Sequence, residues 1–131
     1  MDPISAVSFA ASIVGLLALT KPLIKQLGPS SHSKQELSRM VGVLIALRRS
    51  YESLREFLEF NDDDQSKMLE LLGEPERQCM QAIAVLRKRL ENRGFVDRLL
   101  LGSRWDGKFD KCIKILEDTR GLFDLAMQTD Q

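Results

Sequence analysis

Residues 3–20 read PISAVSFAASIVGLLALT, and between Asp2 and Lys21 the sequence contains no charged residue. Large and small apolar residues would cover every side of a helix drawn through this stretch. Such a helix lies either in a protein core or in a membrane. Asp2 can cap the helix, and Pro3 suits its first position, where no N–H is needed. We therefore expect a helix from Pro3 to Leu27, around which the rest of the chain is organised.

Two interpretations of this helix remain open. A secretory signal would begin with positive charge, and Asp2 argues against it. A permanent membrane span needs about 20 apolar residues, and this run is borderline. The helix is either the centre of a soluble bundle, sheltered by the other helices, or it rests there and can leave for a membrane. The residues we assign to membrane insertion are Ile4, Val7, Phe9, Ile13, Val14, Gly15, Leu16, Leu17 and Leu19.

The composition indicates one all-α domain. The chain has 131 residues, enough for one domain with a real core. Its formal net charge is zero, which argues against a general nucleic-acid binder. Cys79 and Cys112 form no metal motif, and we expect them to be reduced, buried cytosolic thiols. Strand-like alternation is absent, and glycine and proline fall between periodic segments.

The second helix is predicted from Ser33 to about Phe60. Gly28 followed by Pro29 is a strong stop signal for the first helix. Ser33 with Glu36 three residues on resembles a capping box. The spacing of threes and fours defines one stripe that faces a core. This stripe contains Leu37, Met40, Val41, Leu44, Leu47, Tyr51, Leu54 and Leu58.

The next stretch, residues 61–64, reads as an acidic loop before a helix. A calcium-binding loop that starts at Asp62 would need Gly at its sixth position and Glu at its twelfth. Those positions hold Lys67 and Gly73, so the calcium motif fails. Carboxylates do favour a helix N-terminus, which is the better interpretation.

The middle of the chain is predicted to contain a break. We expect a short helical piece over residues 66–72, interrupted at Gly73 to Pro75. A further helix then runs from Pro75 to about Asn92, with Gly94 as its C-cap. Its apolar stripe is Cys79, Ile83, Leu86 and Leu90.

The last part is predicted to hold one or two turns over residues 95–101, ended by Gly102, and then a long helix. Ser103 with Asp106 resembles its cap. Its seam consists of Trp105, Phe109, Cys112, Leu116, Thr119, Phe123 and Ala126. Four main helices with short connections predict an antiparallel four-helix bundle with an additional short helix and the N-terminal helix at its centre.

The sequence shows none of the usual catalytic constellations. His32 is the single histidine, and it falls in a Ser-rich turn with no nucleophile or metal ligand spaced to serve it. No glycine-rich phosphate loop is present. We therefore assign no catalytic, cofactor-binding or metal-binding residues, and we do not expect an enzyme.

Charge is distributed unevenly along the chain. Acidic residues prevail over residues 51–78, and basic residues prevail over residues 85–114. These blocks are either solvated faces or binding surfaces. A basic patch could bind anionic lipid head groups, and each Lys or Arg near the membrane surface would contribute about 1 kcal/mol to the binding free energy. An acidic patch could also meet the basic patch of a second copy, which would favour head-to-tail association. The head-group residues we assign are Arg87, Lys88, Arg89 and Arg93.

The opening MDPISAVSFAASIVGLLAL, residues 1–19, resembles the start of the fungal N-terminal domain found on STAND (NLR-like) proteins. This group is similar to the HeLo and HeLo-like domains and to the four-helix bundle of the mixed-lineage kinase-like executioner of necroptosis. The resemblance implies a cell-death or heterokaryon-incompatibility effector of fungal innate immunity. Such a domain oligomerises on activation, moves from the cytoplasm to the plasma membrane, and permeabilises it through its first helix.

The resemblance also leaves a second function open. The chain would be a domain of a larger signalling protein or a small stand-alone relative, with an NLR-like receptor as partner or neighbouring domain. In the second function the domain is a non-enzymatic oligomerisation adaptor whose first helix never leaves the bundle. Whether lipid binding depends on that helix separates the two.

Overall fold

The computed structural model consists of α-helices and their connections over the residues it describes, which are 3–29, 31–60, 62–102 and 107–128. The backbone alone is described for residues 3–8, 62–66, 68 and 69. The prediction of an all-α chain is confirmed. The helices are α1 (Pro3–Gln26), α2 (His32–Phe60), α3 (Asp62–Glu91), α4 (Arg93–Leu100) and α5 (Gly107–Gln128).

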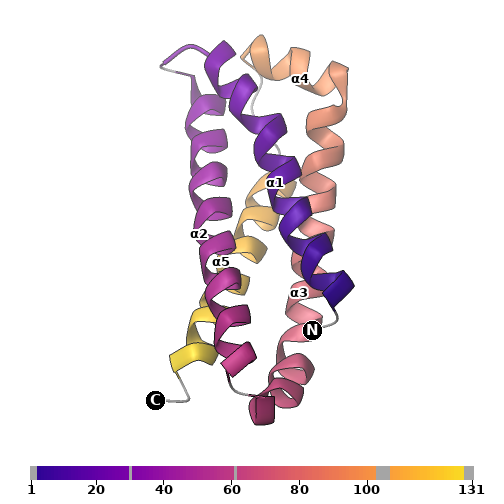
Figure 1. Cartoon of the computed structure of the whole chain (residues 1–131). Helices are drawn as coiled ribbons and strands as arrows, with labels where there is room; N and C mark the ends of the chain where they lie inside the picture. The colour runs from indigo at the N-terminus through magenta and orange to yellow at the C-terminus, as the bar shows by residue number, and fades with distance from the viewer. Residues whose placement is uncertain (1–2, 30, 61, 103–106, 129–131) are drawn as a thin grey trace.

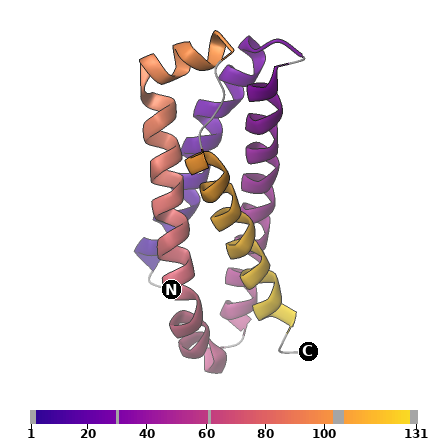
Figure 2. The same ribbon diagram turned by 180° about the vertical axis from the view of Figure 1, so that it is seen from behind.

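The four long helices lie side by side, and the short α4 crosses one end of the molecule (Figure 1). Helix α1 packs on α2 and α3, and α5 packs on the same two helices. Seen from behind, α5 lies in front of α1, between α2 and α3 (Figure 2). The α1–α2 connection lies at the same end as α4, whereas the last turn of α2, the first turn of α3 and the end of α5 lie at the opposite end.

The core is built from the predicted stripes. In α2 every stripe residue is buried except Val41, which is half-buried. The predicted stripe of α3 is buried as well, and so are both cysteines. At the centre three rings from three helices meet: Phe9 lies 4.4 Å from Tyr51 and 6.1 Å from Phe123 between ring centroids. In α5 the buried seam residues are Phe109, Cys112, Leu116, Thr119 and Phe123, while Ala126 is half-buried and Trp105 lies outside the described residues.

Helix α1 is not sheltered on all sides, so the expectation of an enclosed central helix is wrong over its described side chains. Only 33% of the window Phe9–Gln26 is buried. Val14 is 44% exposed, and Ala11 and Ala18 are exposed too. The physical reason is the arrangement of the helices, because α1 packs mainly on α2 and α3 and its opposite side meets solvent.

The predicted break at Gly73 to Pro75 does not exist. Helix α3 runs without interruption from Asp62 to Glu91, with Pro75 inside it. It therefore also replaces the loop predicted over residues 61–64, of which Asn61 lies outside the described residues. A proline inside a helix removes one backbone hydrogen bond. Packing offsets that loss, because the side chains of Leu72 and Cys79 on either side of Pro75 are buried.

The caps of α2 and α4 also differ from the predictions. The hydroxyl of Ser31 accepts a hydrogen bond from the backbone N–H of Lys34 at 3.4 Å, so Ser31 precedes the helix and Ser33 is buried within it. The carboxylate of Glu36 lies 2.8 Å from the imidazole of His32, the exposed first residue of α2.

Asn92, rather than Gly94, separates α3 from α4. Its side-chain oxygen accepts a hydrogen bond from the backbone N–H of Phe95 at 3.0 Å and caps α4, which places Gly94 in the first turn of α4. Gly102 ends α4 as predicted. Its φ of 97° lies in the left-handed region that only glycine adopts without strain. The predicted cap at Ser103 and Asp106 lies outside the described residues.

Pro22 divides α1 near its last turn. It lies inside the helix, and because it has no N–H it cannot donate to the carbonyl of Ala18 one turn earlier. Beyond it, Leu23 and Leu27 are buried in the core. The last turn of α1 is therefore anchored by its own side chains.

Candidate functional site

The residues assigned to membrane insertion do not share one surface. Val14 lies on the outer face of α1, where it is 44% exposed. The side chains of Ile4 and Val7 lie outside the described residues. The buried members are Phe9, Ile13, Leu16 and Leu17, and the half-buried members are Gly15 and Leu19. Insertion of all these residues into lipid would require α1 to turn or to leave the core.

Helix α1 satisfies its buried hydroxyl internally. The Thr20 side chain is buried and donates a hydrogen bond of 2.7 Å to the carbonyl oxygen of Leu16, four residues earlier. This bond stays with the helix wherever the helix lies. A polar group satisfied within its own helix is what a water-free environment requires.

One of the predicted head-group residues is held against α1. A Cβ atom at Gly15 would lie 3.1 Å from the Nη1 atom of Arg87, so the guanidinium covers the missing side chain. The Nε atom of Arg87 also donates to the Oε1 atom of Glu91 at 2.9 Å. Arg87 therefore joins α3 to α1 and is not simply a free head-group ligand.

The other three predicted head-group residues point in different directions. Lys88 and Arg93 are exposed. Arg89 is half-buried, and its guanidinium carbon lies 5.7 Å from the ring centroid of Phe95 in α4. This cation–π contact fixes α4 on the end of α3. The structure thus places the four bases at the same end of the molecule but engages Arg87 and Arg89 in contacts with α1 and α4, and it leaves Lys88 and Arg93 open to an anionic surface.

A buried carboxyl group at the centre of the molecule was missed by the sequence analysis. Glu76 of α3 is only 6% exposed, and its Oε1 atom has no hydrogen-bond partner among the described residues. The Tyr51 hydroxyl is buried without a described partner as well. A signal was available, because position 76 continues the stripe of Cys79 and Ile83 backwards by three residues.

Burial shifts the titration of these central groups. It raises the pKa of Glu76, because the charged form loses its hydration. Burial, followed by the charge of Glu76, raises the pKa of Tyr51. Burial also raises the pKa of the Cys79 thiol to about 12, although a hydrogen bond with Thr119 acts in the opposite direction. Cys79 is therefore a neutral, unreactive thiol at physiological pH.

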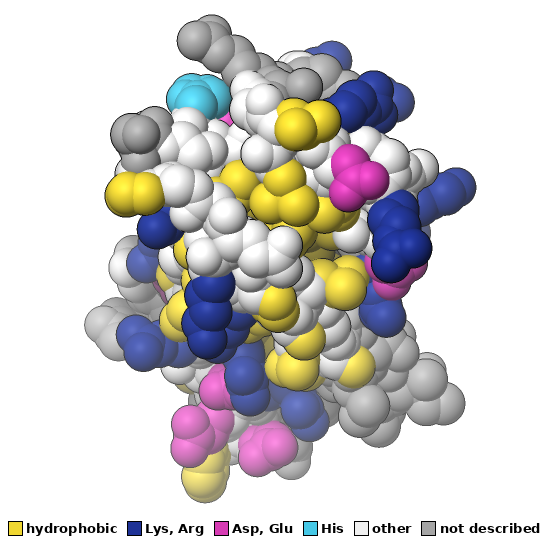
Figure 3. All heavy atoms as spheres, turned by 90° about the horizontal axis from the view of Figure 1, so that it is seen from above, with side chains coloured by type: hydrophobic (Ala, Val, Ile, Leu, Met, Phe, Trp, Pro, Cys, Tyr) yellow, Lys and Arg dark blue, Asp and Glu magenta, His cyan; other side chains and the backbone are white. Residues whose placement is uncertain are grey.

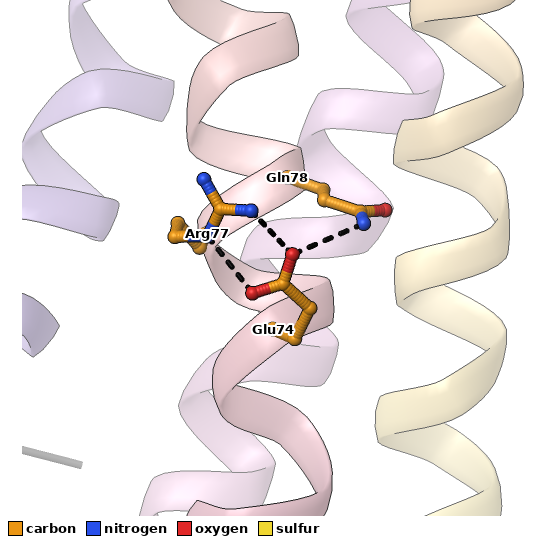
Figure 4. A network of polar contacts seen from close by, with 3 residues as sticks. All are labelled: Glu74, Arg77 and Gln78. Atoms are coloured by element: carbon orange, nitrogen blue, oxygen red, sulfur yellow. Dashed lines mark hydrogen bonds and ion pairs between the residues drawn. The ribbon is translucent and has the colours of Figure 1, made fainter.

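A shallow groove of about 270 Å³ lies between α3 and α5. On its α3 side Arg77 and Gln78 both donate hydrogen bonds to the Glu74 carboxylate, as Figure 4 shows. The hydrogen bonds from Arg77 and then Gln78 lower the pKa of Glu74. The groove is lined by Glu74, Pro75, Gln78, Ile115, Asp118, Thr119 and Leu122. It contains no nucleophile paired with a base, and the described residues include no group of acidic, histidine and cysteine side chains that could hold a metal ion.

The fold gathers the two charged blocks at opposite ends of the molecule. We call the end that carries α4 the basic end and the end that carries the last turn of α2 and the first turn of α3 the acidic end. Seen from above, Lys and Arg side chains surround an apolar centre at the basic end (Figure 3). The basic end is defined by Lys25, Lys34, Arg87, Lys88, Arg89, Arg93 and Arg98, which outnumber its acids Glu36, Glu91 and Asp97. The acidic end is defined by Glu56, Glu59, Glu70, Asp124 and the three aspartates that begin α3, Asp62, Asp63 and Asp64, which outnumber its bases Arg55, Lys67 and Arg120.

Comparison of the chain with protein-family models, with curated proteins and with solved structures gives no match. The resemblance drawn from residues 1–19 therefore stays a prediction, and any function has to be argued from the faces of α1 and the two charged ends.

Proposed function

We propose that this chain is a membrane-targeting effector domain of the cell-death or incompatibility type. It would oligomerise at the plasma membrane and permeabilise it through α1. The observation that carries the proposal is α1 itself: over Phe9–Gln26 it is long and apolar enough to cross a bilayer, and only part of it is buried. The exposed bases Lys88 and Arg93 would meet anionic head groups. An NLR-like receptor partner or domain would supply the trigger.

The outer face of α1 supports a stepwise mechanism. Ala11, Val14 and Ala18 already meet solvent, so first contact with lipid requires no unfolding. Full insertion removes Phe9, Ile13 and Leu16 from the core, at a cost of about 1.5–3 kcal/mol for each buried side chain. Acyl chains are as apolar as the core, so burial in lipid offsets most of that cost.

The packing of the helices supports the finer architecture that the resemblance implies. We infer that α1, α2, α3 and α5 form an antiparallel four-helix bundle with α4 as the additional short helix. The contacts form a closed ring, because α1 and α5 each pack on both α2 and α3. A ring of this kind lets α1 leave while α2, α5 and α3 keep their mutual contacts.

The adaptor function is favoured by one specific observation. Phe9 packs on both Tyr51 and Phe123, so α1 contributes directly to the central aromatic cluster. Withdrawal of this ring forfeits, besides its burial, about 0.5–1.5 kcal/mol for each ring contact. In this alternative α1 is a fixed part of the bundle, and the domain serves only to bring copies of a receptor together.

A matched pair of variants tests the membrane function. Val14→Glu places a charge on the outer face of α1, and Val85→Glu places one at an equally exposed position of α3, since the two valines are 44% and 42% exposed. Both should fold, because exposed sites tolerate substitution within about 0.5 kcal/mol. A carboxylate in the bilayer centre costs at least about 2.5 kcal/mol. Dye release from anionic liposomes should therefore fall about tenfold or more for Val14→Glu and stay near the wild-type rate for Val85→Glu.

The outcome decides between the two functions. Circular dichroism first establishes that both variants keep the helical content of the wild-type chain. Equal leakage by the two variants would show that α1 does not enter the membrane. Absence of leakage from the folded wild-type chain, together with stable self-association, would favour the adaptor.

A further inference from the structure

The most exposed large apolar side chains of the described residues gather at the two ends of the molecule. Leu101, just after α4 at the basic end, is 86% exposed. At the acidic end Phe60 is 83% and Leu71 is 70% exposed. On the flanks between the ends the most exposed valines, Val14 and Val85, reach only 44% and 42%. We call these exposed side chains the apolar centres of the two ends: Leu101 at the basic end, and Phe60 with Leu71 at the acidic end.

The charges around these two apolar centres have opposite signs. Leu101 follows α4, in which the two bases Arg93 and Arg98 outnumber Asp97. Phe60 and Leu71 directly follow the exposed Glu59 and Glu70, which outnumber Lys67 in the turn before Leu71. Like ends of two copies therefore repel each other, and unlike ends attract each other. Because the whole chain has a formal net charge of zero, no overall repulsion between copies opposes this attraction.

We propose that copies of this chain associate end to end, with the basic end of one copy docked on the acidic end of the next. Leu101 of one copy then packs against Phe60 and Leu71 of its neighbour, and the surrounding charges pair across the contact. Because the two surfaces differ, the contact is heterologous and leaves one free end of each kind. Assemblies therefore grow with concentration and do not stop at a dimer.

This inference specifies which surfaces make the self-association that the proposed function includes. It rests on the proposed function only in the assumption that copies of the chain associate. Lipid takes no part in the contact, since both ends belong to the resting fold. Opposite charges steer the encounter and suppress wrong pairings, whereas the apolar centres supply the contact area. The association should therefore weaken between about 0.01 M and about 1 M salt, over which the Debye length falls from about 30 Å to about 3 Å.

The decisive test uses two charge-reversed variants and their mixture, without lipid. Arg93→Glu with Arg98→Glu removes the excess positive charge of the basic end, and Glu59→Lys with Glu70→Lys removes the excess negative charge of the acidic end. Sedimentation velocity at low salt should show each variant alone at least about tenfold weaker in self-association than the wild-type chain. An equimolar mixture should associate again, because unlike ends are restored between the two proteins.

A flank variant is the matched control. Arg49→Glu with Lys114→Glu changes the net charge as much as the basic-end variant does, but on the exposed flanks of α2 and α5. It should associate like the wild-type chain. Leu101→Ser should weaken association about tenfold, whereas Val85→Ser should leave it unchanged, which separates the apolar centre from general hydrophobicity.

Several results would overturn the proposal. It is wrong if the wild-type chain stays monomeric at low salt at every concentration, if the mixture stays monomeric, or if the flank control dissociates as much as the end variants. A monomeric chain whose binding to anionic vesicles depends on Arg93 and Arg98 would mean that a lipid surface occupies the basic end instead. Because no lipid is present in the sedimentation test, its failure is distinguishable from a failure to release dye.

Discussion

Helices α1 and α3 form opposite exceptions to the rule that apolar residues lie inside and charged residues outside. Helix α1 has no charged residue between Phe9 and Thr20, yet Val14 and its neighbours on the outer face meet solvent. Helix α3 is rich in charge, yet it buries the carboxyl of Glu76. Position in the fold, rather than composition, decides burial here. Departures of this kind cost stability, and they concentrate where function needs them.

The comparison predicts the largest effect on the inner face of α1. Phe9→Ala should lower the free energy of unfolding by about 3–5 kcal/mol, because it empties the centre of the aromatic cluster. Val14→Ala on the outer face should change it by less than about 0.5 kcal/mol. Urea denaturation followed by circular dichroism measures both. Similar losses for the two variants would mean that the faces of α1 do not differ as described.

The second-largest expected effect is at Glu76 of α3, where a substitution should stabilise the fold instead of destabilising it. Glu76→Gln should raise the free energy of unfolding at neutral pH by about 1 kcal/mol, because a buried charge whose Oε1 atom has no partner among the described residues no longer has to be accommodated. Burial raises the pKa of Glu76 above its value in the unfolded chain. The stability that its protonation provides is thus fully present below about pH 4.3 and is lost as the pH rises through the folded-state pKa.

A pH series of urea denaturations checks this sign. The difference in unfolding free energy between Glu76→Gln and the wild-type chain should be small near pH 4 and should grow toward about pH 8. Tyr51 and Cys79 stay neutral over this range, because burial raises the pKa of both. A difference that is independent of pH would show that Glu76 keeps its ordinary titration.

The smallest expected change in the free energy of unfolding is at Gly15, where α1 contacts Arg87 of α3. Gly15→Ala removes a glycine from the middle of α1, which by itself stabilises a helix by about 1 kcal/mol. The new Cβ atom would lie 3.1 Å from the Arg87 guanidinium, which must shift by a few tenths of an ångström. Gly42→Ala in α2 has nothing within 4 Å and serves as the control. The gain at Gly15, measured by urea denaturation, should be positive but about half that at Gly42. A net loss would show that Arg87 cannot move.

The long helices could be predicted because their apolar stripes are regular. The α2 stripe from Leu37 to Leu58 keeps one face inward over its whole length, and the structure buries it accordingly. The break expected at Gly73 was wrong because local breaker residues were given too much weight. Leu72 and Cys79 are seven residues apart, which places them on one face only if the helix continues through Pro75.

The candidate site was predicted less well, for a geometric reason. Successive helix residues are rotated by about 100°, so Arg87, Lys88 and Arg89 cannot share one face. Because these residues are adjacent in sequence, one patch was predicted. In the structure Arg87 contacts α1, Lys88 faces solvent, and Arg89 contacts Phe95 of α4. The exposure of Val14 could not be predicted either, because it depends on which helices pack on α1.

Pro22 gives α1 a mechanical asymmetry. A pull on the N-terminus loads the helix up to this residue, where the backbone bond to Ala18 is absent and bending is easiest. Beyond it, Leu23 and Leu27 hold the last turn in the core. In the proposed function α1 would therefore act as a lever with a fixed base: the arm before Pro22 would leave the bundle first, while Leu23 and Leu27 kept the last turn in the core.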